Sequence, residues 1–152
     1  MRGRYAAILP AALAVAAACA PDQIPGPPAG FNHATAMREC GPTDGPAVAI
    51  YLAADSGPLL QPPTPYIVIM VWQSLDRLGQ QAWAVGNELG MAVAWFFSTP
   101  SNSQHATGGR VTVSVVDTAS TIQGSIDLTF PSIGRVNGGF RASWIPRTPL
   151  CG

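Results

Sequence analysis

The chain has 152 residues, of which only 11% are charged, and its formal net charge at neutral pH is zero. The basic residues are eight arginines; without Arg2 and Arg4 at the N-terminus, six face eight acidic residues, a net charge of about −2. This balance excludes the basic face that binding to a nucleic-acid backbone requires. The length fits one domain plus a short extension.

The first nineteen residues, MRGRYAAILPAALAVAAAC, have the order of charge and hydrophobicity that is typical of an export signal. Arg2 and Arg4 precede an apolar stretch at 6–18, which is too short for a bilayer core that needs about 20 residues. The end of this stretch, Ala16-Ala17-Ala18-Cys19, resembles the lipobox of bacterial lipoprotein precursors. The resemblance implies removal of residues 1–18 and acylation of Cys19.

Membrane attachment through Cys19 follows from this resemblance, because several acyl chains together hold a protein stably at a membrane. Ala20 follows the cysteine, which in diderm bacteria implies the outer membrane. We therefore expect a lipid-anchored protein of the bacterial cell envelope, facing the periplasm or the cell surface. The alternative is ordinary secretion after cleavage behind Ala18, which would leave Cys19 as a free thiol.

A tether is predicted after the lipidation site. Residues 20–30, APDQIPGPPAG, contain four prolines and two glycines, so they form neither a helix nor an interior strand. Such a segment extends as a spacer. Residues 31–39 read as a short helical turn or as more tether. We therefore assign 19–39 to lipid attachment and tether, and 40–152 to the folded domain.

Short apolar segments alternate with glycine- and proline-rich turns from Cys40 onward. We expect strands at 47–53, 66–72, 80–85 and 91–98, a helical turn at 74–78 and a polar loop at 99–109. The segment 66–72, YIVIMVW, is apolar on both faces, as a strand covered from both sides would be. Along 47–53 the alternation points Val48, Ile50 and Leu52 toward the core.

The last third of the chain predicts three antiparallel strands at 110–116, 121–130 and 135–145, each with one apolar face. The predicted inward side chains are Val111, Val113, Val115, Ile122, Ile126, Leu128, Phe130, Val136, Phe140, Ala142 and Trp144. Gly124 and Gly138 fall on this face, either as bulges or as bare positions under a ring such as that of Phe140. Six or seven short strands predict an all-β fold, either an antiparallel β-sandwich or a small barrel.

The two remaining cysteines, Cys40 and Cys151, lie at the two ends of the predicted domain. Export would place them in an oxidising compartment, so we predict that they form a disulfide. Free buried thiols and metal ligation are the alternatives. A metal site is disfavoured because the sequence has no Cys-x-x-Cys pair or histidine cluster.

The sequence carries no dinucleotide, P-loop or calcium-loop motif, so we expect no cofactor. His105 has Ser101 and Ser103 nearby, without the turn that positions a catalytic serine. No spacing among the carboxylates favours a catalytic pair, and Asp127 is expected to pair across strands with Arg135 or Arg141. We therefore expect that the protein is not an enzyme.

Four tryptophans are many for this length, and they either pack in the core or, where exposed, offer surfaces for sugar rings. Trp95 and Trp144 lie on apolar faces and are expected in the core. The candidate ligand-facing aromatics are Trp72, Trp83 and Tyr51. The sequence thus predicts an envelope lipoprotein with a structural or protein-interaction domain; the alternative is a module that binds a glycan or another small ligand.

Overall fold

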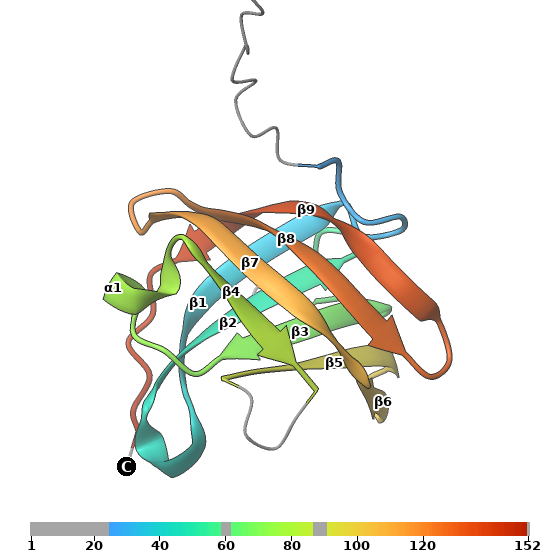
Figure 1. Cartoon of the computed structure of the whole chain (residues 1–152), viewed down its shortest axis with the longest axis horizontal. Coiled ribbons are helices and arrows are strands. Elements are labelled where there is room, and N and C mark those ends of the chain that lie inside the picture. The colour runs from blue at the N-terminus through green and yellow to red at the C-terminus, as the bar shows by residue number, and fades with distance from the viewer. Residues whose placement is uncertain (1–24, 59–61, 87–90, 152) are drawn as a thin grey trace, which may run out of the picture.

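The computed structural model describes residues 25–58, 62–86 and 91–151, and the fold is nearly all β-structure (Figure 1). The described strands are β1 (His33–Cys40), β2 (Pro46–Ala53), β3 (Tyr66–Val71), β4 (Gln81–Val85), β5 (Ala92–Thr99), β6 (Asn102–His105), β7 (Gly108–Asp117), β8 (Thr121–Phe130) and β9 (Gly134–Ile145). They are joined by a short 3-10 turn, η1 (Pro42–Asp44), and a single-turn helix, α1 (Leu75–Leu78).

Eight of these strands close into a barrel in the order β3-β2-β1-β9-β8-β7-β4-β5, because β3 pairs with β5 as well as with β2. The extra strand, β6, pairs with β5 between Trp95 and Thr99, on the edge of β5 that also meets β4 at Ala92. Neighbouring strands are antiparallel except for the short β1–β9 and β4–β5 contacts. The predicted all-β class is therefore confirmed in its barrel form, and the expected six or seven strands are too few.

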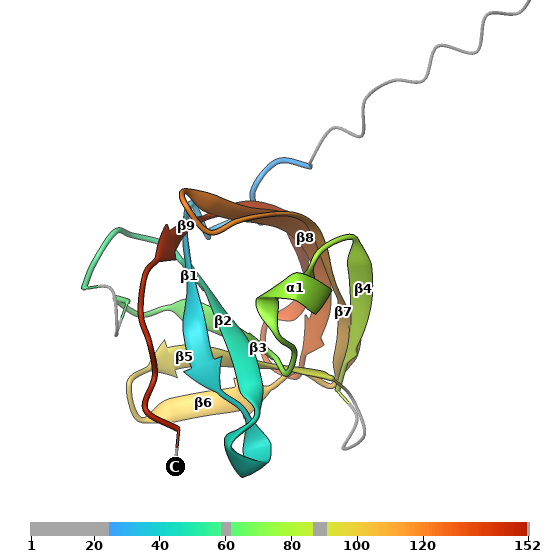
Figure 2. The same cartoon turned by 90° about the vertical axis from the view of Figure 1, so that its left-hand side faces the viewer.

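The barrel interior is a packed hydrophobic core. Val48, Ile50 and Leu52 of β2 are almost completely buried in it, as predicted, together with the inward side chains of β3. Helix α1 lies across one end of the ring of strands, and its Leu78 is fully buried in the same cluster (Figure 2). Eight strands enclose a space that side chains can fill, and here the buried hydrophobic side chains of the strands occupy it.

The prediction that 31–39 forms a helical turn or more tether is wrong, because residues 33–39 belong to strand β1. Strand β1 pairs with β2 over its whole length and with β9 at residues 35–37. Ahead of it, Phe31 is buried, and the N–H of Gly139 donates to the carbonyl of Gly26 over 2.8 Å. The sequence pattern did not predict this strand because its inward positions are alanines, Ala34 and Ala36. Small residues give a weak hydrophobic alternation.

The predicted polar loop at 99–109 is also incorrect, since it contains β6 and the start of β7. Strand β6 reads Asn-Ser-Gln-His and has no apolar residue, so hydrophobic alternation could not reveal it. The remaining expected strands and the helical turn at 74–78 are confirmed, with shifts of one or two residues at their ends.

Because of a β-bulge, the prediction that Val115 points into the core is wrong. The β7–β8 register shifts between Val113 and Val115, which leaves Val115 41% exposed and packs Val116 against the core. A bulge adds one residue and reverses the faces of the residues that follow. The other predicted inward side chains of β7, β8 and β9 are buried in the core or packed against it.

Candidate functional site

A second hydrophobic cluster lies on the outside of the barrel. It covers the outer surface of β1, β2, β3 and β5, and Met37, Ala49 and Val68 at its base are buried. The half-buried side chains around them are Tyr51, Tyr66, Met70, Trp95, Phe97 and Ile145. We call these nine residues the outer apolar face.

The strand register explains how residues distant in sequence come together on this face, since paired residues of adjacent strands point to the same side. One row crosses four strands through Met37, Ala49, Met70 and Val93. The next row crosses through Thr35, Tyr51, Val68 and Trp95. A third passes through Ala53, Tyr66 and Phe97. The segments 66–72 and 91–98 are apolar on both faces because one face fills the barrel and the other builds this surface.

Aromatic rings form the centre of the outer apolar face. The rings of Tyr66 and Phe97 stack with centroids 4.7 Å apart and an interplanar angle of 12°, and the Tyr51 ring lies 6.4 Å from that of Tyr66. At the β6 edge, the indole N–H of Trp95 donates to Nε2 of His105 over 2.9 Å. Each ring is thus fixed by a neighbour, which gives the surface a defined shape.

The two tyrosines remain uncharged at neutral pH. Burial raises the pKa of Tyr51, and the nearby Glu39 and Tyr66 raise it further. Burial also raises the pKa of Tyr66. Both hydroxyl groups therefore add hydrogen-bonding capacity to the surface without adding charge.

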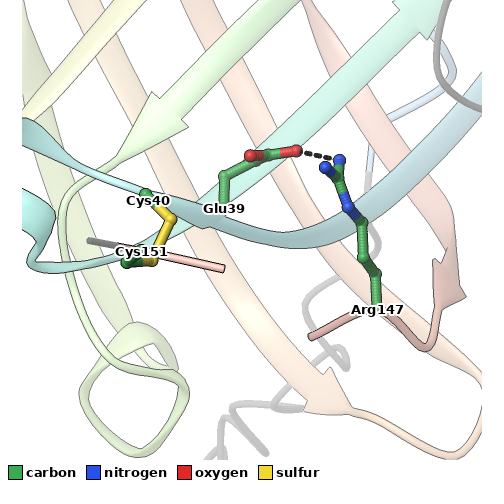
Figure 3. Close-up of a disulfide and its surroundings, with 4 residues drawn as sticks. All are labelled: Glu39, Cys40, Arg147 and Cys151. Atoms are coloured by element: carbon green, nitrogen blue, oxygen red, sulfur yellow. Dashed lines mark hydrogen bonds and ion pairs between the residues drawn. A yellow bond between two sulfur atoms is a disulfide. The ribbon is translucent and has the colours of Figure 1, made fainter. Parts of the chain in front are cut away.

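The C-terminal segment after β9 is held against one border of this face. Cys40 and Cys151 form the predicted disulfide, with Cα atoms 5.7 Å apart and a sequence separation of 111 (Figure 3). In the same view, Arg147 reaches Glu39, the residue before Cys40, with an Nη1–Oε1 distance of 2.5 Å. The same nitrogen of Arg147 lies 3.8 Å from the sulfur of Met37, which is completely buried.

The three predicted ligand-facing aromatics do not lie together. Tyr51 is on the outer apolar face, whereas Trp83 is half-buried and packs against the barrel core. Trp72 is half-buried next to Gly41, where an added Cβ would lie 3.2 Å from Trp72 Cδ1.

Trp95 was expected in the core and lies instead on the outer apolar face, while Trp144 packs against the core as predicted. In β5 the inward positions are Ala92, Ala94 and Phe96. Both faces of this strand are apolar, and small residues fit the narrow barrel interior, so hydrophobicity alone assigned the faces wrongly. The sequence signal for this site was the two-sided apolar character of 66–72 and 91–98.

Among the described residues, no three histidine, cysteine, aspartate or glutamate side chains are grouped so that they could hold a metal ion. His105 is engaged by Trp95. The proposed lipidation site, Cys19, lies outside the described residues. None of the helices in the described part of the chain is long and apolar enough to cross a membrane.

Comparison with known proteins gives no relative from which a function could be transferred: no family model, curated protein or solved structure matches the chain significantly.

Proposed function

We propose that the chain is an exported lipoprotein of the bacterial cell envelope, and that its barrel binds a protein partner through the outer apolar face. The observation that carries the proposal is the partly exposed aromatic surface formed by Tyr51, Tyr66, Trp95 and Phe97 on the outside of the barrel, separate from its hydrophobic core. A continuous apolar patch on the outside of a folded domain marks an interaction site more often than an isolated exposed residue does.

The partner is a protein surface that is itself apolar and uncharged. The charged side chains at the border of the outer apolar face, Glu39 and Arg147, neutralise each other in an ion pair. Covering this face therefore removes no isolated charge from water, which is the costly step in forming an interface. Aromatic residues and methionine, which are enriched at protein–protein interfaces, make up most of the surface.

Glycan binding through the same aromatics is the second candidate. A sugar ring stacks on an open aromatic face, but Tyr66 and Phe97 each use one ring face to stack on the other. The Trp95 N–H, which could donate to a sugar hydroxyl, is bonded to His105. These internal contacts favour the protein partner.

A charge placed in the outer apolar face tests the proposal. Met70→Lys puts an ammonium group among its apolar side chains, and Val115→Lys is the matched control on exposed β7 surface outside this face. We expect the wild type and Val115→Lys to migrate in a complex larger than the single chain after gentle solubilisation, and Met70→Lys to migrate as the single chain. Equal urea midpoints establish that both variants are folded; equal migration of all three would contradict the proposal.

The membrane anchor is supported by the resemblance of residues 16–19 to a lipobox and by the arginines at positions 2 and 4. Wild-type protein is expected to incorporate labelled palmitate and to partition into the detergent phase. Cys19→Ser should remove both properties, whereas the neighbouring change Ala20→Ser should retain them because the cysteine remains. An unlabelled wild-type protein in the aqueous phase would refute lipidation.

A further inference from the structure

A polar groove lies on the side of the barrel opposite the outer apolar face. Strand β8 is four strands away from β3 in either direction around the closed order of eight, so the two surfaces face away from each other. The groove has a volume of about 650 Å³ on the outside of β7, β8 and β9. Its polar lining side chains are Arg110, Thr112, Ser125, Asp127, Thr129 and Arg135.

The strand register places these polar groups in ordered rows. Arg110 of β7 lies directly opposite Asp127 of β8, and Thr112 lies opposite Ser125 in the adjacent row. On the other side of β8, Thr129 lies opposite Arg135 of β9. Three hydroxyl groups therefore surround a centre made of two guanidinium groups and one carboxylate.

The charges in the polar groove do not cancel. Arg135 donates from Nε and Nη2 to the two carboxylate oxygens of Asp127, over 2.7 and 2.8 Å. This is the cross-strand pair expected from the sequence. The hydrogen bond from Arg135 lowers the pKa of Asp127, and the charge of Arg110 lowers it further, so the carboxylate is ionised at neutral pH. Arg110 is exposed and forms no hydrogen bond or ion pair with any other described side chain. One positive charge remains.

We propose that the polar groove binds an acidic saccharide, with the sugar carboxylate held by Arg110 beside Arg135 and the ring hydroxyls bonded to Thr112, Ser125 and Thr129. One excess positive charge matches a monoanion, and the guanidinium fork pairs with a carboxylate through two parallel hydrogen bonds. The hydroxyl lining matches a ligand rich in hydroxyl groups. Among the described lining residues there is no aromatic side chain, so charge and hydrogen bonds provide the recognition. This site is independent of the protein-binding face.

Titration calorimetry on the purified full-length chain tests the site. The probes are galacturonate and its trisaccharide, a neutral galactose trisaccharide and inorganic phosphate. We expect the uronates to bind, the neutral sugar not to bind, and phosphate to bind at least tenfold more weakly than the uronate trisaccharide. Binding of the trisaccharide alone would identify an acidic polysaccharide as the source, and equal binding of galacturonate would identify a free sugar acid; either result supports the site.

Two variants with opposite expected effects separate recognition from folding. Arg110→Gln should weaken uronate binding at least tenfold, because it removes the unpaired guanidinium. Asp127→Asn should strengthen binding several-fold, because it removes a negative charge and releases Arg135. Arg141→Gln, at an exposed arginine of β9 that does not line the groove, should leave affinity unchanged. Absence of uronate binding, equal binding of phosphate or of the neutral sugar, or equal effects of the Arg110 and Arg141 variants would overturn the proposal.

Discussion

Gly124 of β8 lies directly opposite Phe140 of β9, and the ring of Phe140 occupies the space where a side chain at position 124 would stand. A Cβ atom on Gly124 would lie 2.8 Å from Phe140 Cζ and 2.0 Å from the carbonyl oxygen of Thr112. The second contact is with backbone, which cannot rotate away as a side chain can. The core of this barrel therefore depends on a glycine at this position.

Gly124→Ala is expected to lower the free energy of unfolding by about 2 kcal/mol or more, as overpacking of a tight core does. Gly108→Ala is the matched control, because an added Cβ there meets no atom within 4 Å. Its effect should stay within about 0.5 kcal/mol. Urea unfolding of both variants measures the difference, and equal midpoints would show that the β8–β9 pair is not packed as described.

The bulge in β7 gives two adjacent valines different degrees of burial. Val116 packs against the core and Val115 is exposed. Val116→Ala should therefore cost about 1 kcal/mol of unfolding free energy, while Val115→Ala should cost less than about 0.5 kcal/mol. The reverse order would mean that β7 runs without the bulge, as simple alternation in the sequence predicts.

The strands that the sequence revealed are those in which one face is strongly apolar and the other is polar. Strand β8 is the clearest case, with Ile122, Ile126, Leu128 and Phe130 inward. Two strands were not predicted because their two faces do not differ strongly in hydrophobicity. Strand β1 presents alanines to the core, and β6 has no apolar side chain. Both take their conformation from their neighbours, since β1 is paired on both edges and β6 pairs with β5.

The candidate site was less predictable than the fold. An apolar segment such as 66–72 indicates that both faces of the strand are apolar or covered. It does not indicate which of the two faces points into the barrel. Only barrel closure through the β3–β5 pairing decides that Tyr66 and Trp95 point outward. Tyr51 was the one aromatic of the outer apolar face that the sequence singled out. The disulfide was predictable because two cysteines at the ends of a domain that the sequence predicts to be exported have few other roles.

Reduction of the Cys40–Cys151 disulfide is expected to lower the free energy of unfolding by up to about 4–5 kcal/mol, because the bond closes a long loop in the unfolded chain. Cys40→Ser combined with Cys151→Ser should reproduce the loss without reductant. Urea unfolding of oxidised, reduced and double-variant protein measures this. Identical midpoints for all three would contradict a stabilising role. Thiol counting in denaturant without reductant should find neither cysteine reactive.

The turn between β7 and β8 gives a pH dependence that can be assigned to one carboxylate. Asp117 accepts hydrogen bonds from the Ser120 hydroxyl, over 2.6 Å, and from the Ala119 N–H, over 3.0 Å. These bonds, the Ser120 bond first, lower the pKa of Asp117 below its value of about 3.9 in the unfolded chain. The ionised carboxylate therefore stabilises the fold above pH 4, and this contribution is lost as the pH falls through the lowered pKa.

Ser120→Ala removes the stronger of the two bonds and should bring the pKa of Asp117 closer to its unfolded value. The stability difference between wild type and Ser120→Ala should be largest near pH 5–6 and should shrink toward pH 2.5. Urea midpoints measured across that range test this. Curves that stay parallel at every pH would mean that Asp117 is not the responsible group.

Site-specific photo-cross-linking in intact cells tests the central claim, that the outer apolar face binds a protein. The photoreactive residue p-benzoylphenylalanine replaces Tyr66 on this face in one variant and exposed Val115 on β7 in the other. We predict one discrete light-dependent protein adduct at position 66, its loss when Met70→Lys is added, and no such adduct at position 115. No adduct at position 66, or the same adducts at both positions, would contradict the claim.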